Sequence, residues 1–363
     1  MYSVCKKLGK YTLPCRGFFR KDGYEMMNLI DLHCDTISRL MTAGGSHNLA
    51  DNDLSIDLGG MQKAGTLVQF FACFVHAVSY EDAGLTDGST GRHMPAQISP
   101  KAWDRAYQAV LEMAGRIDGE QNDRIRTAHS YGEIRKNQEQ GMISAVKTAE
   151  EGGILNGRLE RLEELYDAGI RLITLTWNYP NCLGFPNSRT GDIMESGLTE
   201  FGFQAVERMN ELGMIVDVSH LSDGGFWDCI KASCVPVCAS HSNARALCPH
   251  PRNLTDEMLK ALGEKGGVAG LNFYPAFLCE NSVAVVDDIA RHAVHMIKTG
   301  GEDVAAVGTD FDGFDNEPHE GWISHVSEME LVWEAMRKRG ITPRQLDKVM
   351  SLNALRVIRE AMK

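Results

Sequence analysis

The 363-residue sequence predicts an α/β protein folded as a (β/α)8 TIM barrel. Two observations lead to this prediction. Eight short apolar runs have the composition of buried strands, and most of them alternate with helical patterns through short connections. Several of these runs also end in a histidine or a carboxylate. Active sites of such barrels lie at the carboxyl ends of the strands, so these polar ends are expected to meet.

The strand pattern begins at residues 29–35, and residues 66–75 form a second buried run. A long excursion over residues 76–140 follows, with turn-rich sequence and then a helical pattern over 103–117. Because the strand rhythm resumes directly afterwards, we interpret it as an insertion between the second and third barrel strands. The six remaining strands are expected at residues 141–147, 171–177, 214–220, 234–241, 267–274 and 303–310.

Helix boundaries stand between these strands. Ser222 and Thr255 are placed as N-caps, and the helices before the fourth, fifth and seventh strands are expected to end at Gly169, Gly213 and Gly266. Residues 324–363 read as C-terminal helices. We therefore expect a single (β/α)8 domain over residues 28–363, preceded by a basic, irregular arm over residues 1–27 that is dispensable for fold and activity.

Composition narrows the class of protein. A net charge of −12 argues against a nucleic-acid partner, because phosphate binding needs a basic surface. The longest apolar runs fall short of the roughly 20 residues that span a bilayer, and the basic start has no continuous apolar segment of a secretory signal. Ten scattered cysteines without a C-x-x-C motif indicate a reducing compartment, so a cytoplasmic location is expected.

The first strand ends in His33-Cys34-Asp35. In an extended chain the two outer residues face the same side, about 7 Å apart at their α-carbons, which suits a shared metal ion. An isolated pattern of this kind is more often structural, as is any one buried histidine at a strand end. Here the candidates at strand ends form a set, which favours a metal site: His33, Asp35, Glu151, His220, His241 and Asp310. Five ligands and an additional acid suit two metal ions and hydrolysis of an amide or ester.

Six short segments keep the order and spacing of a known family: residues 31–35 (DLHCD), 151–153 (EGG), 217–220 (DVSH), 240–242 (SHS), 252–253 (RN) and 308–313 (GTDFDG). With them the chain resembles the membrane dipeptidase (renal dipeptidase) family, peptidase family M19, one of the amidohydrolase-type barrels of metal-dependent hydrolases. The resemblance implies zinc-dependent hydrolysis of dipeptides by a hydroxide that bridges two Zn²⁺ ions. It assigns His33 and Asp35 to one zinc, His220 and His241 to the other, and Glu151 to the bridge, with Glu150 as the neighbouring alternative.

The same resemblance gives Asp310 the role of acid and base, and Arg252 the binding of the free carboxylate of the substrate. Tyr274, at the end of the seventh expected strand, is a candidate for lining the pocket. Trp177 stands where better-known mammalian members place a histidine that contacts the substrate carbonyl, and Asn178 beside it is a candidate to compensate.

Two other readings stay open. Another amidohydrolase-type enzyme would act on N-acyl amino acids or cyclic amides, although such enzymes commonly open with His-x-His and use a carboxylated lysine as the bridge. The second alternative is a barrel that binds metal or peptide without catalysis, and the presence of Asp310 beside the expected ligands argues against it. The expected partners are small peptides, with neither nucleic acid nor membrane, and a homodimer is an option that the sequence does not decide.

Overall fold

The structure is a computed structural model that describes residues 29–42, 47–81 and 98–362. The arm expected over residues 1–27 lies outside the described residues, as does the turn-rich part of the expected insertion from 82 to 97. None of the described helices is both long and apolar enough to cross a bilayer.

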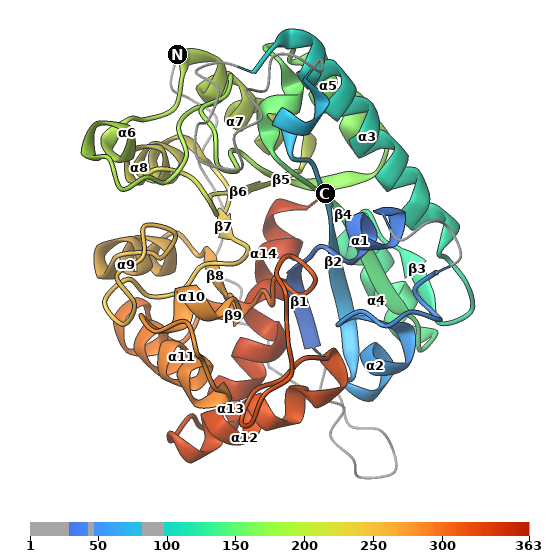
Figure 1. Cartoon of the computed structure of the whole chain (residues 1–363), viewed down its shortest axis with the longest axis vertical. Coiled ribbons are helices and arrows are strands. Elements are labelled where there is room, and N and C mark those ends of the chain that lie inside the picture. Colours follow the sequence, from blue (N-terminus) through green and yellow to red (C-terminus); the bar gives the residue numbers. More distant parts are fainter. Residues whose placement is uncertain (1–28, 43–46, 82–97, 363) are drawn as a thin grey trace.

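Eight parallel strands close into a barrel with helices around it, which confirms the predicted (β/α)8 fold (Figure 1). Closure is complete because β1 pairs with both β2 and β9, and β2 pairs with β4. The barrel strands are β1 (Leu29–Cys34), β2 (Thr66–Phe74), β4 (Ile143–Glu150), β5 (Ile170–Thr174), β6 (Ile215–Asp217), β7 (Cys238–Ala239), β8 (Val268–Leu271) and β9 (Ala305–Val307).

A ninth strand, β3 (Ile125–Thr127), was not predicted. It pairs in parallel with β4 from Ile143 to Ala145, ahead of the stretch of β4 that pairs with β5. The described part of the expected insertion also contains the 3-10 turn η1 (Ala77–Tyr80) and the helices α3 (Pro100–Gly119) and α4 (Tyr131–Glu139). Three residues are too few to show the alternation by which a strand is recognised in sequence.

The expected helix starts are explained by their caps. The hydroxyls of Ser222 and Thr255 accept hydrogen bonds from the amides of Gly225 and Met258. Gly213 ends α7 with a left-handed φ of 83°, which glycine adopts without steric cost. The other elements are α1 (Thr36–Thr42), α2 (Leu58–Lys63), η2 (Gly152–Leu155), α5 (Glu160–Asp167), α6 (Gly191–Glu195), α7 (Glu200–Leu212), α8 (Asp223–Ala232), α9 (Asp256–Glu264), α10 (Pro275–Leu278), α11 (Val286–Gly300), η3 (Val326–Glu328), α12 (Met329–Lys338), α13 (Pro343–Asp347), the π-helical turn η4 (Lys348–Leu352) and α14 (Asn353–Ala361).

The apolar interior has two parts. The larger one includes the helix faces that pack against the outside of the barrel. The smaller one is filled by side chains from all eight barrel strands and by α14, which contacts β1, β8 and β9. Its strand members are Ile30, Leu32, Leu67, Val68, Phe70, Val146, Leu172, Ile215, Cys238, Val268 and Ala306. This filling leaves the carboxyl ends of the strands as the place where polar side chains can gather.

Candidate metal centre

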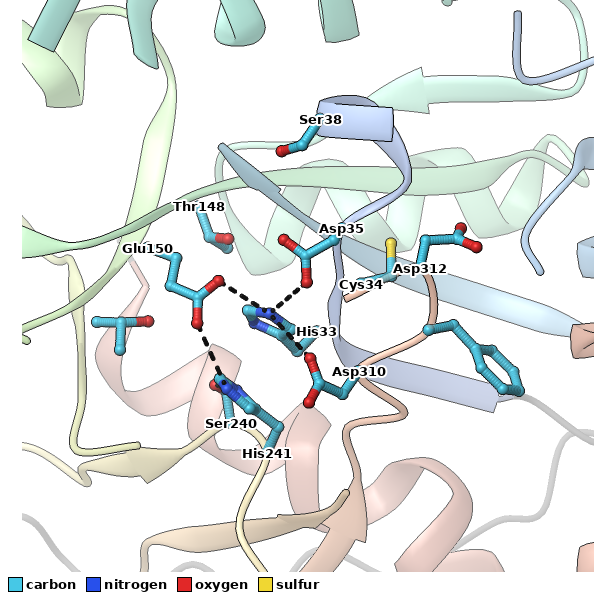
Figure 2. Close-up of polar contacts among 12 residues, drawn as sticks. His33, Cys34, Asp35, Ser38, Thr148, Glu150, Ser240, His241, Asp310 and Asp312 are labelled. Carbon is cyan, nitrogen blue, oxygen red and sulfur yellow. Dashed lines mark hydrogen bonds and ion pairs between the residues drawn. The ribbon is translucent and has the colours of Figure 1, made fainter. Parts of the chain in front are cut away.

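Six titratable side chains converge at the carboxyl ends of the barrel strands. Figure 2 labels five of them, all except His220. They form three overlapping groups, and within each group the possible ligand atoms lie within 4.8 Å of one another. The groups are His33 with His241 and Asp310, Glu150 with His220 and His241, and His33 with Asp35 and Glu150. Shared members make the three groups one cluster, drawn from β1, β4, and the loops that follow β1, β6, β7 and β9.

Glu150, the last residue of β4, lies between the two sides of this cluster. Its Oε2 is 3.3 Å from Nε2 of His33, and its Oε1 is 3.2 Å from Nε2 of His220 and 3.5 Å from Nε2 of His241. Burial by itself raises the pKa of Glu150, but the three histidines together hold that pKa well below its usual range. The carboxylate is therefore charged, with one oxygen directed to each side.

The side formed by β1 and the loop after β9 contains one histidine and two carboxylates. Nε2 of His33 is 3.4 Å from Oδ2 of Asp35 and 3.8 Å from Oδ1 of Asp310. Neither ring nitrogen of His33 forms a hydrogen bond with the described residues, nor does Oδ1 of Asp35, although all three atoms are buried. Buried polar atoms without partners cost free energy, and a bound cation would supply a partner for Oδ1 of Asp35 and for one ring nitrogen of His33.

The other side contains two histidines whose Nε2 atoms are 3.0 Å apart. Their Nδ1 atoms face elsewhere, that of His220 toward Oδ1 of Asn178 at 3.3 Å and that of His241 toward Oγ of Ser240 at 2.7 Å. Burial lowers the pKa of His220 to about 3 and that of His241 well below its usual range. Histidine binds a metal as the neutral imidazole, and these two rings are neutral with their Nε2 atoms directed at each other.

Asp310 has the environment of an acid and base rather than of a permanently charged group. Burial, and then the charges of Asp35 and Glu150, raise its pKa to about 7, against the opposing effect of His33. Oδ2 accepts a hydrogen bond of 2.8 Å from the side-chain amide of Asn272, which leaves Oδ1 on the side of His33. A carboxyl group that titrates near neutral pH can both take up and release a proton.

Arg252 contributes a buried cation beside the cluster. Its two terminal nitrogens donate to Oγ of Ser242 and to the carbonyl oxygen of His241, each at 3.2 Å, whereas its Nε has no partner among the described residues. Burial lowers its pKa to about 10, so the guanidinium remains charged at neutral pH. The guanidinium carbon of Arg252 lies 5.3 Å from the centre of the Phe277 ring.

Comparison with known proteins places this geometry in a family. The sequence matches the membrane dipeptidase family, peptidase family M19, over residues 21–363. The chain belongs to this family. It is thus a peptide-bond hydrolase of the metallo-dipeptidase type.

Individual relatives agree with this assignment. The chain is 30% identical over 310 residues to an uncharacterised dipeptidase of Schizosaccharomyces pombe, which covers 83% of this chain and 71% of that protein. It is 37% identical over 247 residues to an uncharacterised protein of Klebsiella pneumoniae encoded in the pqqA 5' region, with 65% and 89% covered. Among solved structures, dipeptidase AC of family M19 superposes with a TM-score of 0.80 at 28% identity, covering 93% of this chain and 99% of that one. A metallo peptidase from Rhodobacter sphaeroides, bound to a phosphinate mimic of the dipeptide L-Ala-D-Ala, gives 0.79 at the same identity and coverage.

The structure corrects one expected position in this dipeptidase. Glu151 was expected in the cluster, but its carboxylate faces away and accepts hydrogen bonds from the amide of Gly153 at 2.8 Å, the side chain of Asn181 at 2.6 Å and the amide of Trp177 at 3.2 Å. Successive side chains of a strand point to opposite faces, and Val146 belongs to the apolar filling of the barrel. Glu150 therefore faces the same side as Val146, whereas Glu151, with a φ of 109°, turns out of the strand.

The expected substrate-binding residues lie at different distances from the cluster. The Trp177 ring is 6.2 Å from that of His220 and packs with Phe74, His76 and Tyr179, each within 5.4 Å of it. Asn178 contacts His220 directly, as described above. Tyr274 is 37% exposed and packs on Phe277 and Phe314, so it contacts the ring that also lies near Arg252.

Two buried aspartates, Asp31 and Asp217, were part of the recognised segments but had been given no role. The carboxylate of Asp31 accepts hydrogen bonds from the amide and the hydroxyl of Thr309 at 2.9 and 2.7 Å, and from Gln69 at 3.0 Å. The carboxylate of Asp217 accepts from the amide and the hydroxyl of Ser240 at 2.8 and 2.6 Å. Their signal in the sequence is their place two or three residues before His33 and His220, but it does not reveal the partners, which come from other strands.

Proposed function

We propose that this chain hydrolyses dipeptides with two zinc ions held in the cluster. The observation that carries the proposal is Glu150, whose two oxygens face the two sides separately. His33 and Asp35 would hold one ion, His220 and His241 the other, and Glu150 both. The unpartnered atoms of His33 and Asp35 and the facing Nε2 atoms fit such an occupancy. Imidazole nitrogens with carboxylate oxygens are a donor set that suits zinc.

Zinc ions in such a site polarise the scissile carbonyl group and lower the pKa of water. Asp310 would take the proton of the attacking water and deliver it to the leaving amine, a role supported by its pKa of about 7. Asn272 holds one oxygen of Asp310 and thereby orients the other toward the reacting atoms.

Arg252 would bind the free carboxylate of the substrate. Its buried Nε has no partner, and the guanidinium plane can donate two parallel hydrogen bonds to a carboxylate. A fixed cation near the reacting atoms favours a substrate whose terminal carboxylate is one residue from the scissile bond, which is a dipeptide. The dipeptide mimic bound by the Rhodobacter sphaeroides structure supports this substrate size. We further propose that Trp177 and Tyr274 border the substrate and that Asn178 acts through His220.

The test combines metal analysis with a substrate panel. Zinc-loaded protein is assayed with dipeptides, their C-terminal amides, tripeptides and N-acyl amino acids, and we expect preference for free dipeptides and two zinc equivalents per chain. Arg252→Ala should raise KM for dipeptides and remove the preference over the amides, because the charge partner is lost. Arg208→Ala is the control, since that arginine of α7 pairs with Glu163 of α5 at 2.7 Å, away from the cluster. Faster cleavage of N-acyl amino acids, or equal cleavage of amides by the wild type, would overturn the dipeptidase proposal in favour of a broader amidohydrolase.

A further inference from the structure

A chain of three buried side chains leads from Asp217 to the imidazole of His241. Oγ of Ser240 is 2.6 Å from Oδ2 of Asp217 and 2.7 Å from Nδ1 of His241. Each of the three residues is fully buried. Asp217 is further fixed by the hydroxyl of Thr174 at 2.6 Å and by the amides of Ser219 and Ser240 at 3.0 and 2.8 Å.

The direction of these hydrogen bonds follows from the number of protons available. A serine hydroxyl has a single proton to donate, and a carboxylate oxygen can only accept. Ser240 therefore donates to Asp217, and its oxygen can only accept from His241. Nδ1 of His241 then carries the ring proton, and the lone pair is on Nε2, which is the atom that lies 3.5 Å from Glu150 and 3.0 Å from Nε2 of His220.

The other two histidines of the cluster have weaker supports. Nδ1 of His220 is 3.3 Å from an amide oxygen of Asn178, and an amide can present either of its two ends. Nδ1 of His33 has no partner among the described residues. His241 is thus the histidine of the cluster whose tautomer is set by a carboxylate through an intervening hydroxyl.

We propose that Ser240 and Asp217 are positioning residues that fix His241 as the Nδ1–H tautomer and keep its Nε2 lone pair available to a metal ion. The consequence for metal binding rests on the proposed function, but the tautomer does not. Partners of this kind behind a metal-binding histidine typically contribute about 10–100-fold to metal affinity. They act on the ligand and not on the substrate.

The experiment uses the full chain, stripped of metal with a chelator and then reloaded with zinc. Histidine ¹⁵N NMR of the metal-free wild type, with the His241 signals assigned from His241→Gln, should show the Nδ1–H form. Ser240→Ala should produce a mixture of tautomers and weaken zinc binding by about 10–100-fold in a chelator competition. Asp217→Asn should likewise release the tautomer, because the side-chain amide can donate to Ser240.

Ser219→Ala is the matched control. Its hydroxyl is also buried and lies 3.3 Å from that of Ser240, but it accepts from the backbone amide of His241 and not from the ring. This variant should keep the tautomer and stay within about threefold of the wild-type zinc affinity. An Nε2–H tautomer in the wild type overturns the proposal, even if Ser240→Ala does not fold. So does an equal loss of affinity in Ser219→Ala and Ser240→Ala. A wild type with the Nδ1–H form that retains no zinc and cleaves no dipeptide would instead count against the proposed function alone.

Discussion

The two sides of the metal centre are built on the same plan. On one side, the carboxylate of Asp31 in β1 accepts hydrogen bonds from the amide and the hydroxyl of Thr309, which follows β9. On the other side, the carboxylate of Asp217 in β6 accepts hydrogen bonds from the amide and the hydroxyl of Ser240, which follows β7. In each case a buried carboxylate joins neighbouring strands at the level where the site begins. Such bonds fix the strand ends, because breaking one leaves a buried charge or donor without a partner.

The two sides differ in the next contact of the hydroxyl group, that of Ser240 on one side and that of Thr309 on the other. Ser240 continues to the ring of His241, whereas the hydroxyl of Thr309 receives the amide of Phe311 and reaches no ring. His33 instead lies among the carboxylates of Asp35, Glu150 and Asp310. The protein thus orients the ring of His241 on the β6–β7 side, and on the β1–β9 side it supplies charge. We infer that the ring of His33 depends more on the bound cation for its orientation than the ring of His241 does.

The largest expected effect comes from the residue that joins the two sides. Glu150→Gln should reduce zinc retention by well over about 100-fold and abolish most activity, since loss of residues that merely orient a ligand already costs about 10–100-fold. Elemental analysis and chelator competition measure the result. Glu151→Gln is the adjacent control, because that carboxylate faces Gly153 and Asn181, and it should retain both zinc equivalents. Two zinc ions in Glu150→Gln would show that the sides bind metal independently.

Asp310 belongs to the β1–β9 side but is expected to act on protons. Asp310→Asn should lower kcat by roughly 10²–10⁴ with zinc content near that of the wild type. Steady-state kinetics with a free dipeptide and metal analysis on the same preparation separate the two effects. Loss of one zinc equivalent in this variant would make Asp310 a ligand instead, and full activity would remove it from the mechanism.

The sequence predicted the barrel because its strands are apolar runs that alternate with helices, and it predicted five of the six clustered side chains because they follow those runs. Between Glu150 and Glu151 it favoured Glu151, which directly precedes the glycine pair, but the structure places Glu150 in the cluster. Every residue of β4 is buried, and polar residues occur on both of its faces, so the sequence pattern does not identify the face that carries the site. Counting in steps of two from the apolar Val146 would have favoured Glu150, but only once Val146 was known to face the barrel interior.

The parts that sequence could not supply depend on contacts between distant segments. The partners Thr309 and Ser240 come from segments 278 and 23 residues away from Asp31 and Asp217. Two strand ends of the site were also placed too late, because β6 ends at Asp217 and β9 at Val307. His220 and Asp310 lie in the loops beyond them, both with left-handed φ values of 65° and 61°. Single backbone hydrogen bonds to the neighbouring segments continue there, from the amide of Val218 to Cys238 at 2.8 Å and from that of Asp310 to His33 at 3.1 Å, but the regular strand does not.

A smaller effect is expected when the hydroxyl of Thr309 is removed, and it should differ in kind from the loss of the Ser240 hydroxyl. Thr309→Val removes the donor to Asp31 at constant shape and leaves every ring of the cluster with its present partners. We expect the free energy of unfolding to fall by about 1–3 kcal/mol, because a buried carboxylate loses a donor and the amide of Phe311 loses its acceptor. Zinc affinity should remain within about threefold of the wild type, in contrast to Ser240→Ala. Denaturant unfolding and chelator competition provide the two values. Equal losses of zinc affinity in the two variants would remove the distinction between the sides.

The smallest expected effect is a loss of stability at low pH through His292, which contacts the loop after β7. His292 of α11 accepts the amide of Ala244, three residues after His241, at 3.1 Å through Nδ1, and its Nε2 is 3.0 Å from the carbonyl oxygen of Leu278. Burial, assisted by the neighbouring Arg291 and His295, lowers the pKa of His292 from 6.5 to about 4, despite Leu278 and Asp288. The unfolded chain therefore binds more protons between these values, so the stabilisation is complete above the unfolded pKa and is lost as the pH falls toward 4.

Lowering the pH from 7 to 5.5 should cost about 1 kcal/mol through this group, from the difference in protonation between the unfolded and folded chains. His292→Gln has no such titration and can still accept the amide of Ala244. We therefore compare the pH dependence of the free energy of unfolding in the two proteins, because the contributions of all other groups then cancel. The wild type should lose about 1 kcal/mol more than the variant over this range. Parallel curves would mean that His292 is not held neutral, and that the loop after His241 does not depend on it in acid.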